Sequence, residues 1–305
     1  SRSAFFVVHI PPRKRFLLGA WLLHAGWAGT PATLERELDS LAESLPGARI
    51  GIAVLGPDGT VFSRQDSLLP MLSIFKFPLA LAVLEKAARE DIPLSTPIDV
   101  GPEWLESGTY SPLRDSLPET GGRVTLAALL HYSTSLSDNI ACDRLLDLVG
   151  GPEAVDQYLR ARGFDGFRIA ASEHTMHLDP ENQRINVARP SALCALFARF
   201  LQGGFLPPAQ ETFLRHLLEG ATTGANKLRA GLPEGTVLGH KTGSSDRILQ
   251  GIRIAENDAG YVRLPDGSSY CIAVMVIDSP ADDAANTALI ATISRTVYEY
   301  FRKNR

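Results

Sequence analysis

The stretch 68-LLPMLSIFKFPLALAVLEKA-87 decides the fold, because it predicts a buried helix on which two polar groups stand out. The Ser73 hydroxyl and the Lys76 amine interrupt its apolar first half, and residues at i and i+3 of a helix share a face. A serine becomes a good nucleophile when a neighbouring base takes its proton, and apolar surroundings lower the pKa of a lysine amine. The pair is a candidate nucleophile and base, although a capping serine and a snorkelling lysine would show the same spacing.

The rest of the chain places this helix in a long helical block between two sets of strands. Two strand-like runs flank the turn Pro57-Asp58-Gly59, and three more cover residues 235–244, 251–264 and 269–279 before a final helix. This order predicts an α/β fold of the α+β sandwich kind, with one antiparallel sheet built from both chain ends, flanked by helices, and an inserted all-helical domain. We expect residues 1–28 to precede the mature chain, 29–72 with 236–305 to form the α/β domain, and 73–235 the helical domain. A cleft between the two domains would be the natural ligand site.

Composition favours a small-molecule or protein partner. The chain has 305 residues, enough to bury a core without disulfides or metals, and a formal net charge of -4. No global basic field points to nucleic acid or to a membrane surface. Cys142, Cys194 and Cys271 lack metal-ligand spacing, and small core residues are favoured over one disulfide with an odd thiol.

The N-terminus has the three parts of a secretory signal. The basic cluster Arg13-Lys14-Arg15 precedes an apolar stretch, Phe16 to Ala28, that ends in small residues. The stretch is too short to span a bilayer. We expect cleavage near Ala28, export to the periplasm and no membrane attachment afterwards; a buried N-terminal helix is the alternative.

Two further motifs follow in order. Ser137-Asp138-Asn139 lies between two predicted helices, and Lys241-Thr242-Gly243 lies in a strand-like run. Ser-x-x-Lys, Ser-Asp-Asn and Lys-Thr-Gly together resemble the signature of penicillin-binding proteins and class A serine β-lactamases. The resemblance runs from about Thr33 to the C-terminus and implies the β-lactamase/transpeptidase-like fold.

The resemblance implies a role for each motif residue. Ser137 can relay a proton to the leaving nitrogen, and Asn139 can bond a substrate amide. Lys241 supplies positive charge for a substrate carboxylate, which the hydroxyls of Thr242 and Ser244 can also bond. Backbone N–H groups of Ser73 and Ser244 would form the oxyanion hole. Asp138 is expected to bond local backbone, and Gly243 to let a ligand approach the strand.

Glu173 separates a lactamase from a penicillin target. It stands roughly midway between the second and third motifs, where class A β-lactamases carry the glutamate that activates the deacylating water. Glu181 is the rival carboxylate, in a stretch that reads as exposed loop. The usual Glu-x-x-Leu-Asn pattern is replaced by Glu173-His174-Thr175-Met176-His177, which resembles the PER-like subgroup and makes His177 a candidate water-positioning residue. A zinc site with His174 and Asp179 lacks a convincing third ligand.

Two looser matches complete the predicted site. Tyr110 in "SGTYSPL" matches an aromatic wall of the family's pocket, with ordinary packing as the alternative. The arginine that many class A enzymes place on the strand after Lys-Thr-Gly has no match here. Lys227 is favoured as its replacement over Arg229, although a lysine lacks the bidentate fork of an arginine.

The sequence therefore predicts a monomeric, periplasmic serine β-lactamase that needs no cofactor or metal. Either Lys76 or Glu173 would deprotonate Ser73. A D-alanyl-D-alanine peptidase or transpeptidase shares the three motifs but does not need Glu173. A penicilloyl-binding sensor domain is the third possibility, and such sensors are tethered to membrane segments.

Overall fold

A five-stranded antiparallel sheet forms the centre of the computed structural model, which describes residues 32–105 and 108–304. The predicted signal segment lies outside the described residues. The sheet order is β2-β1-β10-β9-β8, and each neighbouring pair is antiparallel. The strands are β1 (Arg49–Leu55), β2 (Val61–Arg64), β8 (Leu238–Ser244), β9 (Arg253–Arg263) and β10 (Ser269–Ser279). Both chain ends build the sheet, as predicted, and β8 is one of its edges.

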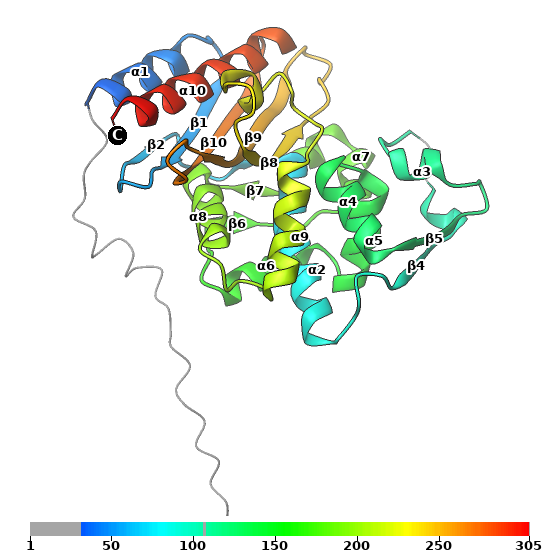
Figure 1. Cartoon of the computed structure of the whole chain (residues 1–305). Coiled ribbons are helices and arrows are strands. Elements are labelled where there is room, and N and C mark those ends of the chain that lie inside the picture. The colour runs from blue at the N-terminus through cyan, green and yellow to red at the C-terminus, as the bar shows by residue number, and fades with distance from the viewer. Residues whose placement is uncertain (1–31, 106–107, 305) are drawn as a thin grey trace, which may run out of the picture.

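Each face of the sheet buries a separate core. On β1, Ile50, Ile52 and Val54 point to one face, where helices α1 (Ala32–Glu43) and α10 (Asp283–Lys303) lie side by side (Figure 1). Ala53, between them, joins the core of the opposite face, because successive side chains of a strand alternate. Helix α8 (Pro190–Leu201) packs there against β1 and β10. The helical block therefore supplies one layer of the sandwich; its boundaries at residues 73 and 235 stay a prediction.

Helix α2 (Lys76–Arg89) runs through the middle of the helical block and contacts α4, α5 and α6. Its residues from Lys76 to Leu84 are all buried, and Phe77 stacks on Phe197 of α8 with ring centroids 4.2 Å apart. Burial of both helix faces explains the continuous apolar sequence. The other helices of the block are α3 (Pro112–Ser116), α4 (Leu126–Ser135), α5 (Asn139–Val149), α6 (Pro152–Ala161), α7 (Glu173–Leu178) and α9 (Pro208–Glu219).

Short elements join these helices. Two small sheets were not predicted, because strands of two to four residues carry no readable alternation. One contains β3 (Leu69–Pro70), β7 (Val187–Ala188) and β6 (Phe167–Arg168), and the other contains β4 (Pro97–Val100) and β5 (Gly122–Thr125). Single-turn 3₁₀ helices are η2 (Leu72–Phe75), η3 (Pro102–Trp104), η4 (Pro180–Arg184) and η5 (Leu228–Gly231).

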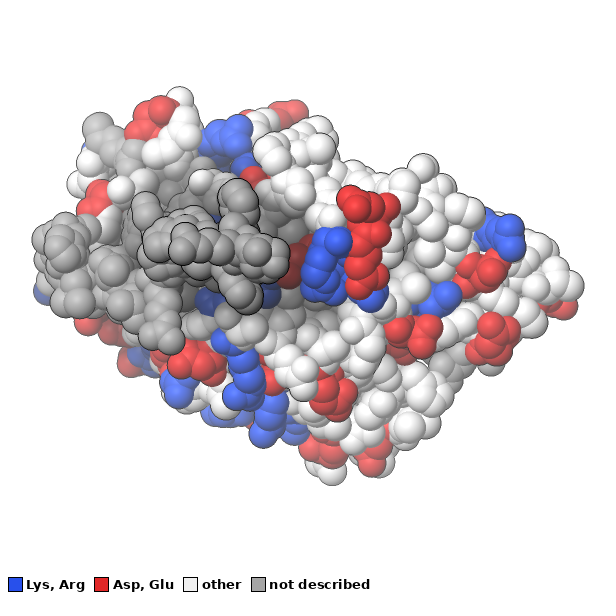
Figure 2. All heavy atoms as spheres, turned by 90° about the horizontal axis from the view of Figure 1, so that it is seen from below, with Lys and Arg blue, Asp and Glu red and all other residues white. Residues whose placement is uncertain are grey.

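Charges of both signs are interspersed over the described surface. On the face shown in Figure 2, acidic and basic side chains stand among a larger uncharged area. Within residues 32–105 and 108–304, no helix is long and apolar enough to cross a membrane. All three cysteines are free and buried, which confirms that they are core residues.

Candidate active site

Ser73 lies in η2, directly before α2, and Lys76 is the first residue of α2. The Lys76 Nζ atom donates to Ser73 Oγ at 3.1 Å, so the predicted pair is in contact. Leu72, just before the serine, has φ +50°, a left-handed conformation that is uncommon for a residue with a side chain. The residues around it are buried, and this packing holds the backbone turn that presents the serine.

The Lys76 side chain is fully buried and surrounded by oxygen atoms. It donates to the carbonyl oxygen of Ser137 at 2.8 Å and to Asn139 Oδ1 at 2.7 Å, and it lies 3.1 Å from Glu173 Oε1. Ser137 itself has φ +60°, which turns its carbonyl into a contact with the lysine. The Lys76 amine is therefore held in place by oxygen atoms from three other residues as well as by Ser73.

Glu173 begins α7, and its carboxylate reaches the nucleophile. Ser73 Oγ donates to Glu173 Oε1 at 3.4 Å, and the glutamate is buried. Glu181 instead lies on η4, is largely exposed and pairs with Arg184 at 2.8 Å. The structure therefore brings Glu173, and not Glu181, to Ser73.

Asp143 of α5 fixes the start of α7. Its carboxylate accepts the backbone N–H groups of Glu173 and His174, each at 2.8 Å. Sequence reasoning missed this residue, although its position one helical turn after Asn139 places it on the same face. Burial raises the pKa of Asp143 to about 6, against the opposing effect of these two hydrogen bonds.

A raised pKa makes Asp143 destabilising once it ionises. Between about pH 4 and pH 6 the folded protein binds more protons here than the unfolded chain, so this contribution to stability falls as pH rises. Asp143→Asn should remove that dependence. The free energy of unfolding of the variant minus that of the parent should rise by at most about 3 kcal/mol between pH 4 and pH 7. Urea unfolding of both proteins at the two pH values measures this. A difference independent of pH would contradict it.

Lys241 of β8 approaches the site from the opposite side. Its Nζ donates to Ser137 Oγ at 2.9 Å and to the carbonyl oxygen of Thr242 at 2.8 Å. Burial lowers the pKa of Lys241 well below its usual range, and the nearby Lys76 and Lys227 cations act in the same direction. Thr242 Oγ1 lies 2.7 Å from Thr223 Oγ1.

Close packing of β8 against η2 explains Gly243. A Cβ atom at this position would lie 2.3 Å from the carbonyl oxygen of Met71 and 3.1 Å from the backbone nitrogen of Ser73. We expected a glycine here so that a ligand could approach the strand. That explanation is incomplete, because the protein's own backbone already excludes a side chain at Gly243. Ser245 N donates to Ala255 O of the neighbouring strand, so the preceding N–H, that of Ser244, points to the free edge of the sheet.

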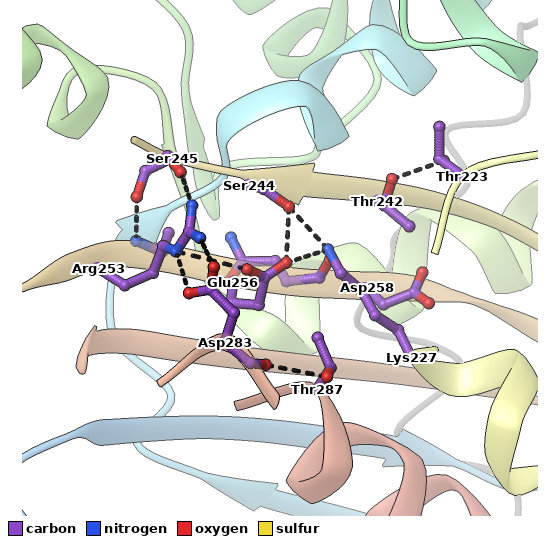
Figure 3. Close-up of polar contacts among 12 residues, drawn as sticks. Thr223, Lys227, Thr242, Ser244, Ser245, Arg253, Glu256, Asp258, Asp283 and Thr287 are labelled. Carbon is purple, nitrogen blue, oxygen red and sulfur yellow. Dashed lines mark hydrogen bonds and ion pairs between the residues drawn. The ribbon is translucent and has the colours of Figure 1, made fainter. Parts of the chain in front are cut away.

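A buried ion pair lies beside Ser244. Lys227 Nζ is 2.5 Å from Glu256 Oε1, and both side chains are about 5% exposed. Dashed lines in Figure 3 join Ser244 on β8 to both partners, with Lys227 Nζ 2.9 Å and Glu256 Oε1 2.6 Å from its Oγ. The rival cation Arg229 donates to the carbonyl oxygen of Thr236.

Glu256 is the second residue that sequence reasoning missed. The available signal was the run Glu256-Asn257-Asp258 within an otherwise apolar strand, since consecutive buried polar residues each need a partner. Asn257 Nδ2 donates to the carbonyl oxygen of Pro70, and Asp258 Oδ1 lies 2.8 Å from His240 Nδ1.

The remaining predicted residues are held as follows. The Asn139 amide also donates to Thr109 Oγ1 at 3.0 Å, so both of its ends have protein partners. His177 Nδ1 lies 2.8 Å from the backbone carbonyl oxygen of Glu173; this contact requires the proton on Nδ1 and leaves Nε2 as an acceptor. Tyr110 is 57% exposed. Asp138 caps α5 through Ala141 N and accepts Leu113 N at 2.7 Å, the expected bonding to local backbone.

These side chains meet at one pocket of about 480 Å³. Lys76 and Lys241 contact two of the residues that line it: Lys76 Nζ donates to Ser73 Oγ, and Lys241 Nζ donates to Ser137 Oγ. Within the described residues, no group of three or more His, Cys, Asp or Glu side chains could hold a metal ion. The predicted residues that line the pocket are Ser73, Tyr110, Ser137, Asn139, Glu173, His177, Lys227, Thr242 and Ser244.

Comparisons with known proteins agree with this geometry. Residues 33–301 match the model of the beta-lactamase enzyme family. A beta-lactamase of Bacteroides uniformis is 40% identical over 88% of this chain and 91% of its own. The extended-spectrum beta-lactamase PER-1 of Pseudomonas aeruginosa is 34% identical over 83% of this chain and 82% of its own, in line with the predicted subgroup.

The fold agrees as well. A class A beta-lactamase of Bacteroides cellulosilyticus, solved by crystallography, superposes with a TM-score of 0.86 at 39% identity, covering 90% of this chain and 99% of its own. The predicted fold class is thereby confirmed. With the family model, the sequence relatives and the fold in agreement, the chain belongs to the beta-lactamase enzyme family and is of the class A type.

Proposed function

We propose that the protein hydrolyses the β-lactam ring of penicillins and cephalosporins through an acyl-enzyme on Ser73, and so gives resistance to these antibiotics. The observation that carries this is the contact of one serine with two groups. Lys76 Nζ lies 3.1 Å and Glu173 Oε1 lies 3.4 Å from Ser73 Oγ. A base is needed once to activate the nucleophile for acylation and again to activate the water that removes the acyl group, and both groups stand beside the serine.

In the first step Ser73 Oγ attacks the lactam carbonyl. Glu173 can take the serine proton directly, because Ser73 Oγ donates to its Oε1. Lys76 becomes a base only after it passes a proton to Glu173 across their 3.1 Å contact. Backbone N–H groups of Ser73 and Ser244 stabilise the negative oxygen that develops.

Ser137 completes ring opening by protonating the lactam nitrogen. Its Oγ accepts a hydrogen bond from Lys241 Nζ at 2.9 Å, which orients its own proton toward the nitrogen and lets Lys241 replace that proton once it has left. Solvent then restores the proton of Lys241 and takes the one that Glu173 received from Ser73, so Glu173 is ionised again before deacylation. Lys241, with three N–H groups, also attracts the substrate carboxylate, and the Thr242 hydroxyl can bond it. We place the substrate's amide side chain near Asn139 and its apolar part against Tyr110.

Deacylation uses Glu173 as the base for water. The buried Glu173 side chain is positioned by Asp143, whose carboxylate accepts the backbone N–H of Glu173 at the start of α7. His177, which donates from Nδ1 to Glu173 O, can accept a hydrogen bond from the same water at Nε2 and so help to position it. Since a carboxylate stands beside the nucleophile, we favour turnover over the stable acylation expected of a transpeptidase or a sensor.

A nitrocefin time course tests this function. We expect steady hydrolysis over many equivalents, because Glu173 supplies a base for the second step. A burst of one equivalent followed by a plateau would indicate a penicillin-binding enzyme or sensor. Absence of any colour change would overturn both.

We further propose that the protein is exported to the periplasm and acts as a monomer without a cofactor. Support comes from the three-part pattern at Arg13–Ala28 and from relatives that are bacterial beta-lactamases. Protein recovered from the periplasm should begin close to Gly29, as N-terminal sequencing would reveal. An intact N-terminus through Phe16 in that fraction would contradict export by this signal.

A further inference from the structure

The end of the pocket beside Ser244 contains an acidic side chain that the proposed reaction does not use. Glu256 lines the pocket and is 4% exposed. Its carboxylate lies next to the β8 residues expected to receive the acidic group of a β-lactam (Figure 3). A negative charge is unexpected in a subsite for a negative ligand, because like charges repel.

Glu256 also occupies the hydrogen-bond donors of this subsite. Ser244 Oγ has a single proton, which it donates to Glu256 Oε1 at 2.6 Å while accepting from Lys227 Nζ at 2.9 Å. The three N–H groups of Lys227 face three oxygen atoms, those of Glu256, Ser244 and the Asn257 carbonyl at 3.1 Å. Neither side chain can donate to a substrate carboxylate without giving up a bond to the protein.

The neighbouring charged residues leave Glu256 bound to Lys227 and Ser244. Arg253 Nε is 3.7 Å from Glu256 Oε2, but the same guanidinium binds Asp283, with Nη2 to Oδ2 at 2.5 Å. Asp283 also binds Arg247, so this carboxylate is shared by two arginines. Lys227 is paired directly with Glu256, and its positive charge is therefore offset within the pocket. Lys241 lies outside this cluster, and a substrate carboxylate bound beside it would favour its charged form against the burial that lowers its pKa.

We propose that Glu256 is a specificity-determining residue that competes with the acidic group of the substrate for Lys227 and Ser244. The inference rests on the proposed function and adds a preference among β-lactams. The Glu256 carboxylate reduces the advantage of substrates with a free carboxylate over those whose acid is masked as a neutral ester.

The test compares benzylpenicillin with benzylpenicillin methyl ester, which differ only in this charge. We measure kcat/KM for both with the parent and Glu256→Gln, which removes the charge and keeps the shape. The ratio of acid to ester should rise roughly 10-fold in the variant, the size of one charge-assisted hydrogen bond. The gain should lie mainly in KM, because the side chains of Lys227 and Ser244 would meet the carboxylate, whereas only the backbone N–H of Ser244 meets the reacting carbonyl. Glu181→Gln, the same change at an exposed residue outside the pocket, should leave the ratio as in the parent.

Other outcomes overturn the proposal. A ratio that falls would make Glu256 a support that positions Lys227 and Ser244 for the substrate, and an equal rise for acid and ester would indicate a change of shape. If the parent hydrolyses neither compound, the proposed function fails and this inference with it. Should Glu256→Gln fail to fold because Lys227 loses its counter-charge, Glu256→Asp keeps that charge but draws it back from Ser244. It should still raise the ratio, by a smaller factor, and an unchanged ratio in a folded Glu256→Asp would refute the proposal.

Discussion

Ser73→Ala should abolish both β-lactam turnover and covalent labelling by benzylpenicillin, because both reactions need the same oxygen atom. Removing a covalent nucleophile leaves only the oxyanion hole and substrate binding, and such losses in serine hydrolases reach about 10⁶-fold in kcat. The fold should survive, since the substitution removes one partly buried hydroxyl from η2 and leaves the apolar residues of α2 in place. Hydrolysis of nitrocefin and intact-protein mass spectrometry measure the two losses.

Ser63→Ala is the matched control. Ser63 is an exposed serine on β2, at the sheet edge opposite β8, so the variant should keep turnover and labelling. An acyl adduct found on Ser73→Ala would place the nucleophile elsewhere and overturn the assignment of all three motifs.

The residues that could be predicted from sequence are those that lie close together along the chain. Ser73 and Lys76 meet because a single helical turn places them on one face, and their contact at 3.1 Å follows from spacing alone. The run around Lys241 forms the predicted strand, β8, which places the lysine beside Ser137. Glu173 was harder, because its place depends on a loop; the family resemblance, together with the exposed-loop sequence around Glu181, selected it.

The residues that were missed act through contacts between distant segments. Asp143 supports α7 from α5, and Glu256 reaches Lys227 across a gap in sequence that no periodicity describes. A sequence pattern indicates that a buried acid requires a partner, but it does not identify the partner. The reason for Gly243 was missed for the same cause: the Met71 carbonyl that excludes a side chain there belongs to another element.

The second large effect concerns Glu173. Glu173→Ala should slow deacylation far more than acylation, and the variant should accumulate a long-lived penicilloyl adduct on Ser73. Loss of a general base costs about 10²–10⁴-fold, or roughly 3–5 kcal/mol of barrier. Acylation has a substitute, because Lys76 still lies beside the nucleophile as a second candidate base once the Glu173 carboxylate is gone. Lys76 contacts Ser73 directly, and a base in that position is poorly placed to serve the water as well.

Mass spectrometry after mixing with benzylpenicillin distinguishes the cases, with Glu181→Ala as the control. Glu181 is largely exposed and pairs with Arg184, so the Glu181→Ala variant should turn over like the parent and should accumulate no adduct. If Glu173→Ala turns over as fast as the parent while Glu181→Ala retains the adduct, Glu181 and not Glu173 is the base for water. If the parent itself retains the adduct, the buried Glu173 does not activate water, and its role reduces to the ion pair that holds Lys76 beside the nucleophile.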